Sequence, residues 1–314
     1  MWDQDQTKMK TLLLIDGNAI MHRAYHALPP FKTKKGIPTH VIYGFFSMLF
    51  RAVSEFKPTH VVVCFDTPKP TFRNKIFKQY QAQRPKIHDD FISQIPLLKE
   101  ALEASGIKQL EKDGFEADDV IGTLAKQAGK ENMKVLILTG DRDILQLVDR
   151  NIFVIAPQLG LSNLTMYDEK GVKNKMSVTP SEIPDLKALT GDPSDNYPGA
   201  KGIGPKTAAQ LIRKFRTVEK LFTQLEKVDN IKMRIILESE KKSVFLSKKL
   251  AQIDVSVPLD FDLHTSGFKG FHEALKEYLT KLEIKSLIKR IFAENKPAEK
   301  KEPEKEDKNQ MGLF

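Results

Sequence analysis

Three short apolar runs, each followed closely by an aspartate, dominate the hydrophobic pattern of the chain. They are Thr11–Ile15 before Asp16, His60–Phe65 before Asp66, and Val135–Thr139 before Asp141. Continuous apolar runs of this length are typical of strands buried on both faces, as in parallel sheets. Helical spacing at 41–56, 91–104 and 116–128 separates the runs. This alternation predicts an α/β domain over residues 1–180.

The pattern changes after about residue 180 and predicts a second, mostly helical domain over residues 181–293. Its expected helices are 206–215, 218–225, 231–238, 243–253 and 271–282. Thr179-Pro180 is typical of a helix N-cap followed by proline at the first helical position. Residues 294–314 are rich in Lys, Glu and Pro, and we expect a solvated, disordered tail there.

Charge and composition narrow the class of protein. The chain of 314 residues carries a net charge of +9, and its tail holds five lysines and six acidic residues, so the positive charge belongs to the body. A basic body is compatible with a nucleic-acid partner and equally with ordinary solubility. The single cysteine excludes an internal disulfide, and no apolar run approaches the ~20 residues of a membrane span. We expect a soluble cytoplasmic protein.

Acidic residues gather where a parallel sheet would place a ligand, at the carboxyl ends of its strands. The candidate metal ligands are Asp16, Asp66, Glu116, Asp118, Asp119, Asp141, Asp143, Asp192 and Asp195. A single acidic cluster at a helix start has an ordinary structural explanation in the helix dipole. Several clusters converging on one edge would repel each other unless cations intervene, and oxygen-only ligands suit Mg²⁺ or Mn²⁺. Two or more such ions would support phosphodiester cleavage.

Other site types fit less well. His22 and His26 have helical spacing but no third zinc ligand, and GAKGIGPKT lacks the preceding strand of a phosphate-binding P-loop. Asp16-Gly17-Asn18 departs from the Asp-x-Asp of phosphatases that form an aspartyl-phosphate.

A glycine-rich turn over residues 196–215 predicts a helix-hairpin-helix that binds DNA without sequence preference. Backbone N–H groups at a helix start bind phosphate, and lysine and arginine add attraction that does not depend on sequence. The candidate DNA-binding residues are Lys201, Gly202, Gly204, Lys206, Arg213 and Lys214. The alternative is an ordinary turn between two helices.

With these features in place, the chain resembles the 5′-nuclease domains of bacterial DNA polymerase I, members of the flap endonuclease family. The matching stretches are LLLIDGNAIMHRAYHALPP, KPTHVVVCFD, FRNKIFKQYQAQRP, GFEADDVIGTLA, ILTGDRDILQLV, LTGDPSDNYPGAKGIGPKTA and LEIKSLIKRIF. The resemblance implies a monomeric 5′–3′ exonuclease and flap endonuclease that removes 5′ flaps and RNA primers during DNA replication and repair.

The resemblance also assigns roles to residues. It implies that the nine acids bind metals directly or through water, and that K⁺ binds at the hairpin. It further implies a helical arch over about residues 69–95, in which Arg73, Tyr80 and Arg84 contact the scissile region. One position departs from the family: Gln81 stands where a lysine usually follows the arch tyrosine, and Lys78, on the same face of the expected helix, is a candidate substitute.

Two other functions compete with the nuclease. One is a DNA-binding or clamp-recruited module with weak or lost catalysis, and the other is a ribonuclease that cuts single strands. The last five residues resemble the peptide by which bacterial replication proteins bind the sliding clamp, with Gln310, Leu313 and Phe314 at its key positions. The length of the chain leaves no room for polymerase domains.

Overall fold

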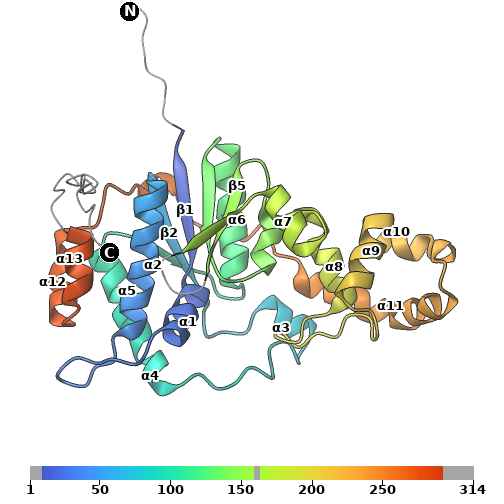
Figure 1. Ribbon diagram of the computed structural model, residues 1–314, viewed down its shortest axis with the longest axis horizontal. Coiled ribbons are helices and arrows are strands. Elements are labelled where there is room, and N and C mark those ends of the chain that lie inside the picture. The colour runs from blue at the N-terminus through green and yellow to red at the C-terminus, as the bar shows by residue number, and fades with distance from the viewer. Residues whose placement is uncertain (1–8, 159–162, 293–314) are drawn as a thin grey trace, which may run out of the picture.

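A computed structural model describes residues 9–158 and 163–292, and a six-stranded sheet lies at its centre (Figure 1). The strands run in the order β3-β2-β1-β4-β5-β6, parallel except for the antiparallel pair β5–β6. Their bounds are β1 Thr11–Asp16, β2 His60–Phe65, β3 Lys108–Glu111, β4 Lys134–Leu138, β5 Ile152–Pro157 and β6 Leu164–Tyr167.

The central strands are buried on both faces, which confirms the prediction made from their apolar runs. Leu12 and Leu14 of β1 belong to the core on one face of the sheet, and Leu13 and Ile15 belong to the core on the other. β3, β5 and β6 were not expected. β3 and β6 are four-residue edge strands with half-exposed or exposed side chains, so they lack the continuous apolar signal of β1.

One face of the sheet is covered by α1 Gly17–Ala27, α2 His40–Phe56 and α5 Gln94–Ala104, together with α12 Glu273–Lys281 and α13 Lys285–Phe292. Leu275, Leu279 and Leu287 of the last two helices are fully buried in this core. The expected helical domain, 181–293, is therefore divided, because its last two helices pack on each other and on α5 and α2 of the α/β domain (Figure 1).

The other face is covered by α6 Ala117–Lys130, and the remaining helices continue from it to the far end of the molecule (Figure 1). They are α7 Glu169–Met176, α8 Ile183–Thr190, α9 Pro205–Phe215, α10 Val218–Thr223 and α11 Ile231–Ala251, with 3₁₀ turns at Asp143–Leu147, Pro180–Glu182, Leu225–Lys227 and Leu263–Ser266. Among the described residues, no helix has the length and apolar character needed to cross a bilayer.

Two helical predictions need correction. The arch helix expected over about 69–95 is only α3 Phe72–Ile76 and α4 Asp89–Ile92, joined by turns and extended chain in which Gln81 has a φ of 57°. Few apolar side chains in this segment have a core to enter, and Pro85 disfavours helix at the residue before it. Residues 231–238 and 243–253, expected as two helices, form the single helix α11, since the charged residues between them are good helix formers.

Candidate metal centre at the carboxyl edge of the sheet

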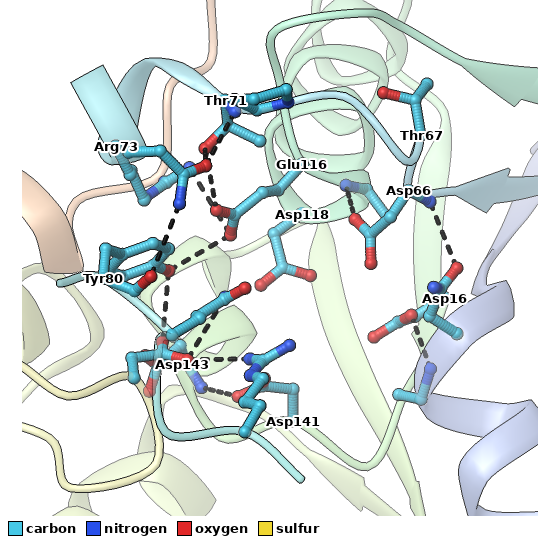
Figure 2. A pocket seen from close by; sticks show the side chains of 18 of the residues that line it. Asp16, Asp66, Thr67, Thr71, Arg73, Tyr80, Glu116, Asp118, Asp141 and Asp143 are labelled. Carbon is cyan, nitrogen blue, oxygen red and sulfur yellow. Dashed lines mark hydrogen bonds and ion pairs between the residues drawn. The ribbon is translucent and has the colours of Figure 1, made fainter. Parts of the chain in front are cut away.

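A cavity of about 790 Å³ opens at the carboxyl edge of the sheet, and acidic side chains line it (Figure 2). The acids around it are Asp16, Asp66, Glu116, Asp118, Asp141, Asp143 and Asp195. They come from the ends of β1 and β2, the start of α6, the segment after β4 and the loop after α8. Strand and helix ends that are far apart in the sequence therefore line the same cavity.

The strand-end aspartates are held by local hydrogen bonds. Asp16 caps α1 by accepting from the Ala19 amide at 2.9 Å, and its second oxygen accepts from the Thr139 hydroxyl at 2.7 Å. Asp66 accepts from the Ala117 amide at 2.7 Å, which joins β2 to the first turn of α6. These bonds fix the carboxylates where the chain leaves the sheet.

The start of α6 brings two more carboxylates to the cavity. Glu116 is the N-cap residue of α6 and accepts hydrogen bonds from the hydroxyls of Thr71 and Tyr80, each at 3.2 Å. Asp118 extends into the cavity between Glu116 and Asp66 (Figure 2), and no side-chain hydrogen bond to its carboxylate is present among the described residues. Asp118 is therefore the acid with the least compensation from the protein.

Burial and mutual repulsion raise the pKa values of the strand-end group. Burial raises the pKa of Asp16 and of Glu116 to about 7, and burial with the charges of Asp141 and Asp16 raises the pKa of Asp118 well above its usual range. The pKa values of Asp66 and Asp141 are also raised, first by burial. Such a set requires cations to stay ionised at neutral pH.

Asp143, Asp192 and Asp195 form a second, tighter group, which we call the loop triad. One carboxylate oxygen from each lies within 4.8 Å of the others, a spacing that could hold a metal ion. Ser194 supports Asp192 by donating to Asp192 Oδ1 from its amide at 2.8 Å and its hydroxyl at 2.5 Å.

The loop triad has cations of its own, Lys187 and Arg84, of which the sequence had not indicated Lys187. Lys187 of α8 lies 2.6 Å from Asp143 Oδ1 and also contacts Asp192, and Arg84 donates to Asp195 at 2.7 Å. Burial would raise the pKa of Asp192, but the hydrogen bonds from Lys187 and Ser194 outweigh it and lower that pKa. The sequence does contain a signal for Lys187, because this lysine stands in the mostly apolar stretch LKALT of α8. A lysine in such a stretch is partly buried and needs an acidic partner.

Asp119, expected as a metal ligand, does not line the cavity. It is fully buried, and its two oxygens accept from the Arg73 guanidinium at 2.7 and 2.8 Å. Arg73 is also buried and donates to the carbonyls of Leu250 and Gln252, so its nitrogens join α3, α6 and the end of α11. Asp119 is thus committed to Arg73, whereas Arg73 also lines the cavity and lies 3.6 Å from Glu116.

The segment after α3 rests on the loop triad. The Tyr80 hydroxyl lies 3.2 Å from a carboxylate oxygen of Asp195 and 3.2 Å from one of Glu116, and donates to both. The backbone N–H of Gln81 donates to the backbone carbonyl of Asp195 at 2.9 Å. Lys78 is exposed in the same run of turns and shares no helix face with Gln81, so the helix-face argument for Lys78 was wrong.

The glycine turn precedes α9 as the sequence predicted. Gly202 has a φ of 90°, which favours glycine, and Gly204 is the N-cap residue of α9, with no side chain capping the helix. Lys201 and Lys206 are exposed beside it. Arg213 and Lys214 are exposed in the last turn of α9, roughly 10 Å along the helix, so the structure does not bring them to the turn.

The donor chemistry of the edge fits divalent cations. Seven acidic side chains line the cavity, and their carboxylate oxygens are the ligands that Mg²⁺ and Mn²⁺ prefer. Gln310, Leu313 and Phe314 of the expected clamp peptide lie outside the described residues.

Comparisons with known proteins agree with this arrangement. Residues 11–177 match the family model of the 5′–3′ exonuclease N-terminal resolvase-like domain, and residues 178–274 match that of its C-terminal SAM fold. The 5′–3′ exonuclease of Aquifex aeolicus is 41% identical over 286 residues, covering 90% of this chain and 96% of that protein. DNA polymerase I of Bacillus subtilis is 37% identical over 294 residues, covering 93% of this chain.

The chain spans about a third of the length of the DNA polymerase I relatives that it matches. Among solved structures, the T5 D15 protein co-crystallised with metal ions aligns with a TM-score of 0.65 at 19% identity, covering 89% of this chain and 100% of that one. The catalytic core of Rad2 in complex with DNA substrate aligns with a TM-score of 0.54 at 16% identity, covering 91% of this chain and 89% of that one. At these identities the structures support the fold alone.

Proposed function

Because the chain belongs to the 5′–3′ exonuclease family, we propose that it is a metal-dependent nuclease that hydrolyses phosphodiester bonds at 5′ flaps and 5′ ends of duplex DNA, including RNA primers. The observation that carries the proposal is the ring of strand-end carboxylates around one open cavity, with pKa values raised by burial and mutual repulsion. That arrangement is costly for the protein unless cations bind it.

In this proposal the acids have different roles. Asp16, Asp66, Glu116, Asp118 and Asp141 hold one or more Mg²⁺ or Mn²⁺ ions, and the loop triad holds another. Bound divalent ions would supply charge stabilisation for the attacking and leaving oxygens. Asp119 keeps Arg73 fixed, and Arg73 in turn keeps α3 on α6 and α11, so both act as positioning residues.

Tyr80 and Arg84 border the same cavity and could reach a scissile phosphate there. Since both bind Asp195 in this structure, engaging DNA would require them to exchange the carboxylate for a phosphate. Arg84 is the better suited of the two, because its guanidinium is exposed and can form paired hydrogen bonds with phosphate.

Duplex DNA would bind along the glycine turn. The free backbone N–H groups of Lys206 and Thr207 at the start of α9 suit a phosphate, and the exposed Lys201 and Lys206 add charge. A K⁺ ion bound at the turn is part of the proposal. Replacing Gly202 and Gly204 by valine should weaken binding equally on unrelated duplexes and reduce its salt dependence.

The decisive test is cleavage of a 5′-flap duplex with Mg²⁺ and with EDTA, comparing the parent chain with Asp141→Ala. We expect cleavage near the flap base only with metal, and a loss of at least 100-fold in Asp141→Ala with DNA binding retained. A chain that binds the duplex but never cleaves it would instead be a DNA-binding module. Preference for unpaired RNA would identify the single-strand ribonuclease.

The tail adds a partner to the proposal. Met311, Leu313 and Phe314 follow a strongly polar stretch, and apolar side chains on a polar tether suit a groove-binding peptide. We expect a bacterial sliding clamp to bind the intact chain and not a chain lacking residues 310–314, measured by fluorescence polarisation. A monomer that acts on chromosomal DNA would lie at the nucleoid, which imaging of a fluorescent fusion checks.

A further inference from the structure

The backbone of Tyr197 pairs with that of Asp192 of the loop triad through two N–H···O bonds of 2.9 and 3.1 Å. Nothing in the reaction outlined above uses the side chain of Tyr197. Its ring stacks on that of Tyr80, with centroids 6.5 Å apart and an interplanar angle of 14°, and Leu250 and Ala251 complete the apolar contact. The side chain is 3% exposed. A phenylalanine would fill this space and make the same contacts, so the packing does not account for the hydroxyl.

The hydroxyl of Tyr197 is buried and has no hydrogen-bond partner among the described residues. Burial, followed by the charges of Asp143, Asp192 and Asp195, raises the pKa of Tyr197, so the hydroxyl stays protonated. A buried hydroxyl without a partner destabilises a fold, and native proteins give such groups a partner in protein, water or an ion.

The neighbouring acid Asp143 already has a partner. Its Oδ1 lies 2.6 Å from the Lys187 ammonium and is compensated by that ion pair. Tyr80 differs from Tyr197 because its hydroxyl already donates to Glu116 and Asp195. Among the described residues, the Tyr197 hydroxyl is therefore a buried oxygen without a partner beside the carboxylates whose spacing suits a metal ion.

We propose that the Tyr197 hydroxyl is a positioning group for a divalent cation held by the loop triad, to which it is linked by a hydrogen bond with a water of the ion's hydration shell. Mg²⁺ keeps several waters when it binds carboxylates, and each such water needs hydrogen-bond partners from the protein. The hydroxyl of Tyr197 is a neutral group that serves this purpose without adding charge to an already acidic site. This inference rests on the metal-binding role in the proposed function.

The experiment compares the parent chain with Tyr197→Phe in the absence of DNA. Mn²⁺ binding is measured by isothermal titration calorimetry and by the metal-induced rise in melting temperature, each protein having first been stripped with EDTA. We expect Tyr197→Phe to melt at or above the parent temperature in EDTA, since an unpaired buried hydroxyl has been removed. Its Mn²⁺ affinity at the affected site should fall about 10-fold, the lower end of the usual cost of losing a group that hydrogen-bonds to a metal's ligands.

Two controls make the result specific. Tyr167→Phe removes a hydroxyl that accepts from Lys175 far from the acids, and its Mn²⁺ binding should match the parent. In an Asp192→Asn background the additional change Tyr197→Phe should have little further effect, because both changes act on the same ion.

The outcomes separate this inference from the proposed function. Equal Mn²⁺ affinity in the parent and Tyr197→Phe, within two-fold, overturns the role of Tyr197 while leaving the metal centre intact. A lower melting temperature of Tyr197→Phe in EDTA with unchanged Mn²⁺ affinity does so too, because the hydroxyl would then have a partner within the protein. A parent chain that binds no Mn²⁺ overturns both proposals.

Discussion

The two groups of carboxylates at the sheet edge solve the same electrostatic problem in opposite ways. The strand-end group, Asp16, Asp66, Glu116, Asp118 and Asp141, lines an open cavity, and its pKa values are raised. The loop triad is compensated by Lys187 and Arg84, and the pKa of Asp192 is lowered. Asp143 belongs to the triad but has a pKa raised by burial and by Asp141 to about 7, which makes it the link between the groups.

This difference in charge compensation indicates what each group of carboxylates contributes to the metal-free protein. The strand-end carboxylates are held by strand and helix ends, and Arg73 compensates Glu116 from a distance of 3.6 Å. Their remaining repulsion is relieved by protons or added cations. Asp195 of the loop triad holds the segment after α3 in place by accepting hydrogen bonds from the side chains of Tyr80, Gln81 and Arg84. The strand-end group is arranged for metal binding, whereas the loop triad also stabilises the segment after α3.

The largest expected effect comes from neutralising one acid of each group. Asp118→Asn should reduce flap cleavage by at least 100-fold yet raise the melting temperature in EDTA, because a repelled, buried charge is removed. Asp192→Asn should lower that melting temperature by roughly 3 °C or more, since Lys187 loses a charged partner. Differential scanning fluorimetry and single-turnover cleavage measure both, and stability changes of the same sign would contradict the comparison.

The pH dependence of stability tests the raised pKa values directly. With pKa values of about 7 for Asp16, Glu116 and Asp143, the folded form binds more protons than the unfolded chain between pH 4 and 7. The free energy of unfolding therefore falls as the pH rises through this window. In EDTA the melting temperature should drop by roughly 5 °C between pH 5.5 and 7.5.

Saturating Mg²⁺ should shrink that drop, because bound cations replace the protons. Groups with lowered pKa values, such as Asp192 and Glu182, lose their contribution only below about pH 4 and do not affect this window. A melting temperature in EDTA that stays level or rises from pH 5.5 to 7.5 would show that the strand-end acids are compensated by the protein itself.

Lys187→Met sharpens the comparison by giving the loop triad the character of the strand-end group. Without the ammonium between Asp143 and Asp192, the metal-free protein should melt at a lower temperature, and the rise produced by Mn²⁺ should be larger than in the parent. The measurement is the melting temperature across a Mn²⁺ titration. Lys175→Met, at a surface lysine, is the matched control. An unchanged Mn²⁺ response would mean that Lys187 and the ion occupy separate places.

The smallest expected effect concerns Gln81. Its side chain lies 3.3 Å from Asp195, so Gln81→Lys would add a cation beside the loop triad. We expect a single-turnover cleavage rate equal to or a few-fold above the parent, since a cation there would stabilise charge developing on the phosphate. Lys78→Ala should leave the rate unchanged because Lys78 is exposed and shares no helix face with Gln81. A slower Gln81→Lys would show that charge from this segment is not limiting.

The local pattern of apolar and acidic residues was enough to predict the buried strands and the edge at which the acids lie. Buried strands such as Thr11–Asp16 leave a continuous apolar signal, and the position of an acid just after such a strand fixes it to the ligand-binding edge of a parallel sheet. The edge strands β3 and β6 carry no such signal, because half of their environment is solvent. The helix predicted over about 69–95 was too long for a related reason. The conformation of residues 77–88 depends on contacts with the loop triad, and these contacts do not appear in the periodicity of the sequence.

The sequence by itself determined the α/β class, the gathering of acids at one edge and the glycine turn before α9, since each depends on short-range periodicity, turn chemistry or the direction of parallel strands. Only the tertiary structure decided how charges pair across distant segments. It joined Asp119 to Arg73, inserted Lys187 between two acids, buried the Tyr197 hydroxyl and folded α12 and α13 back onto α5 and α2. These depend on which side chains share a buried volume, and residues more than 40 positions apart leave no periodic trace of that in the chain.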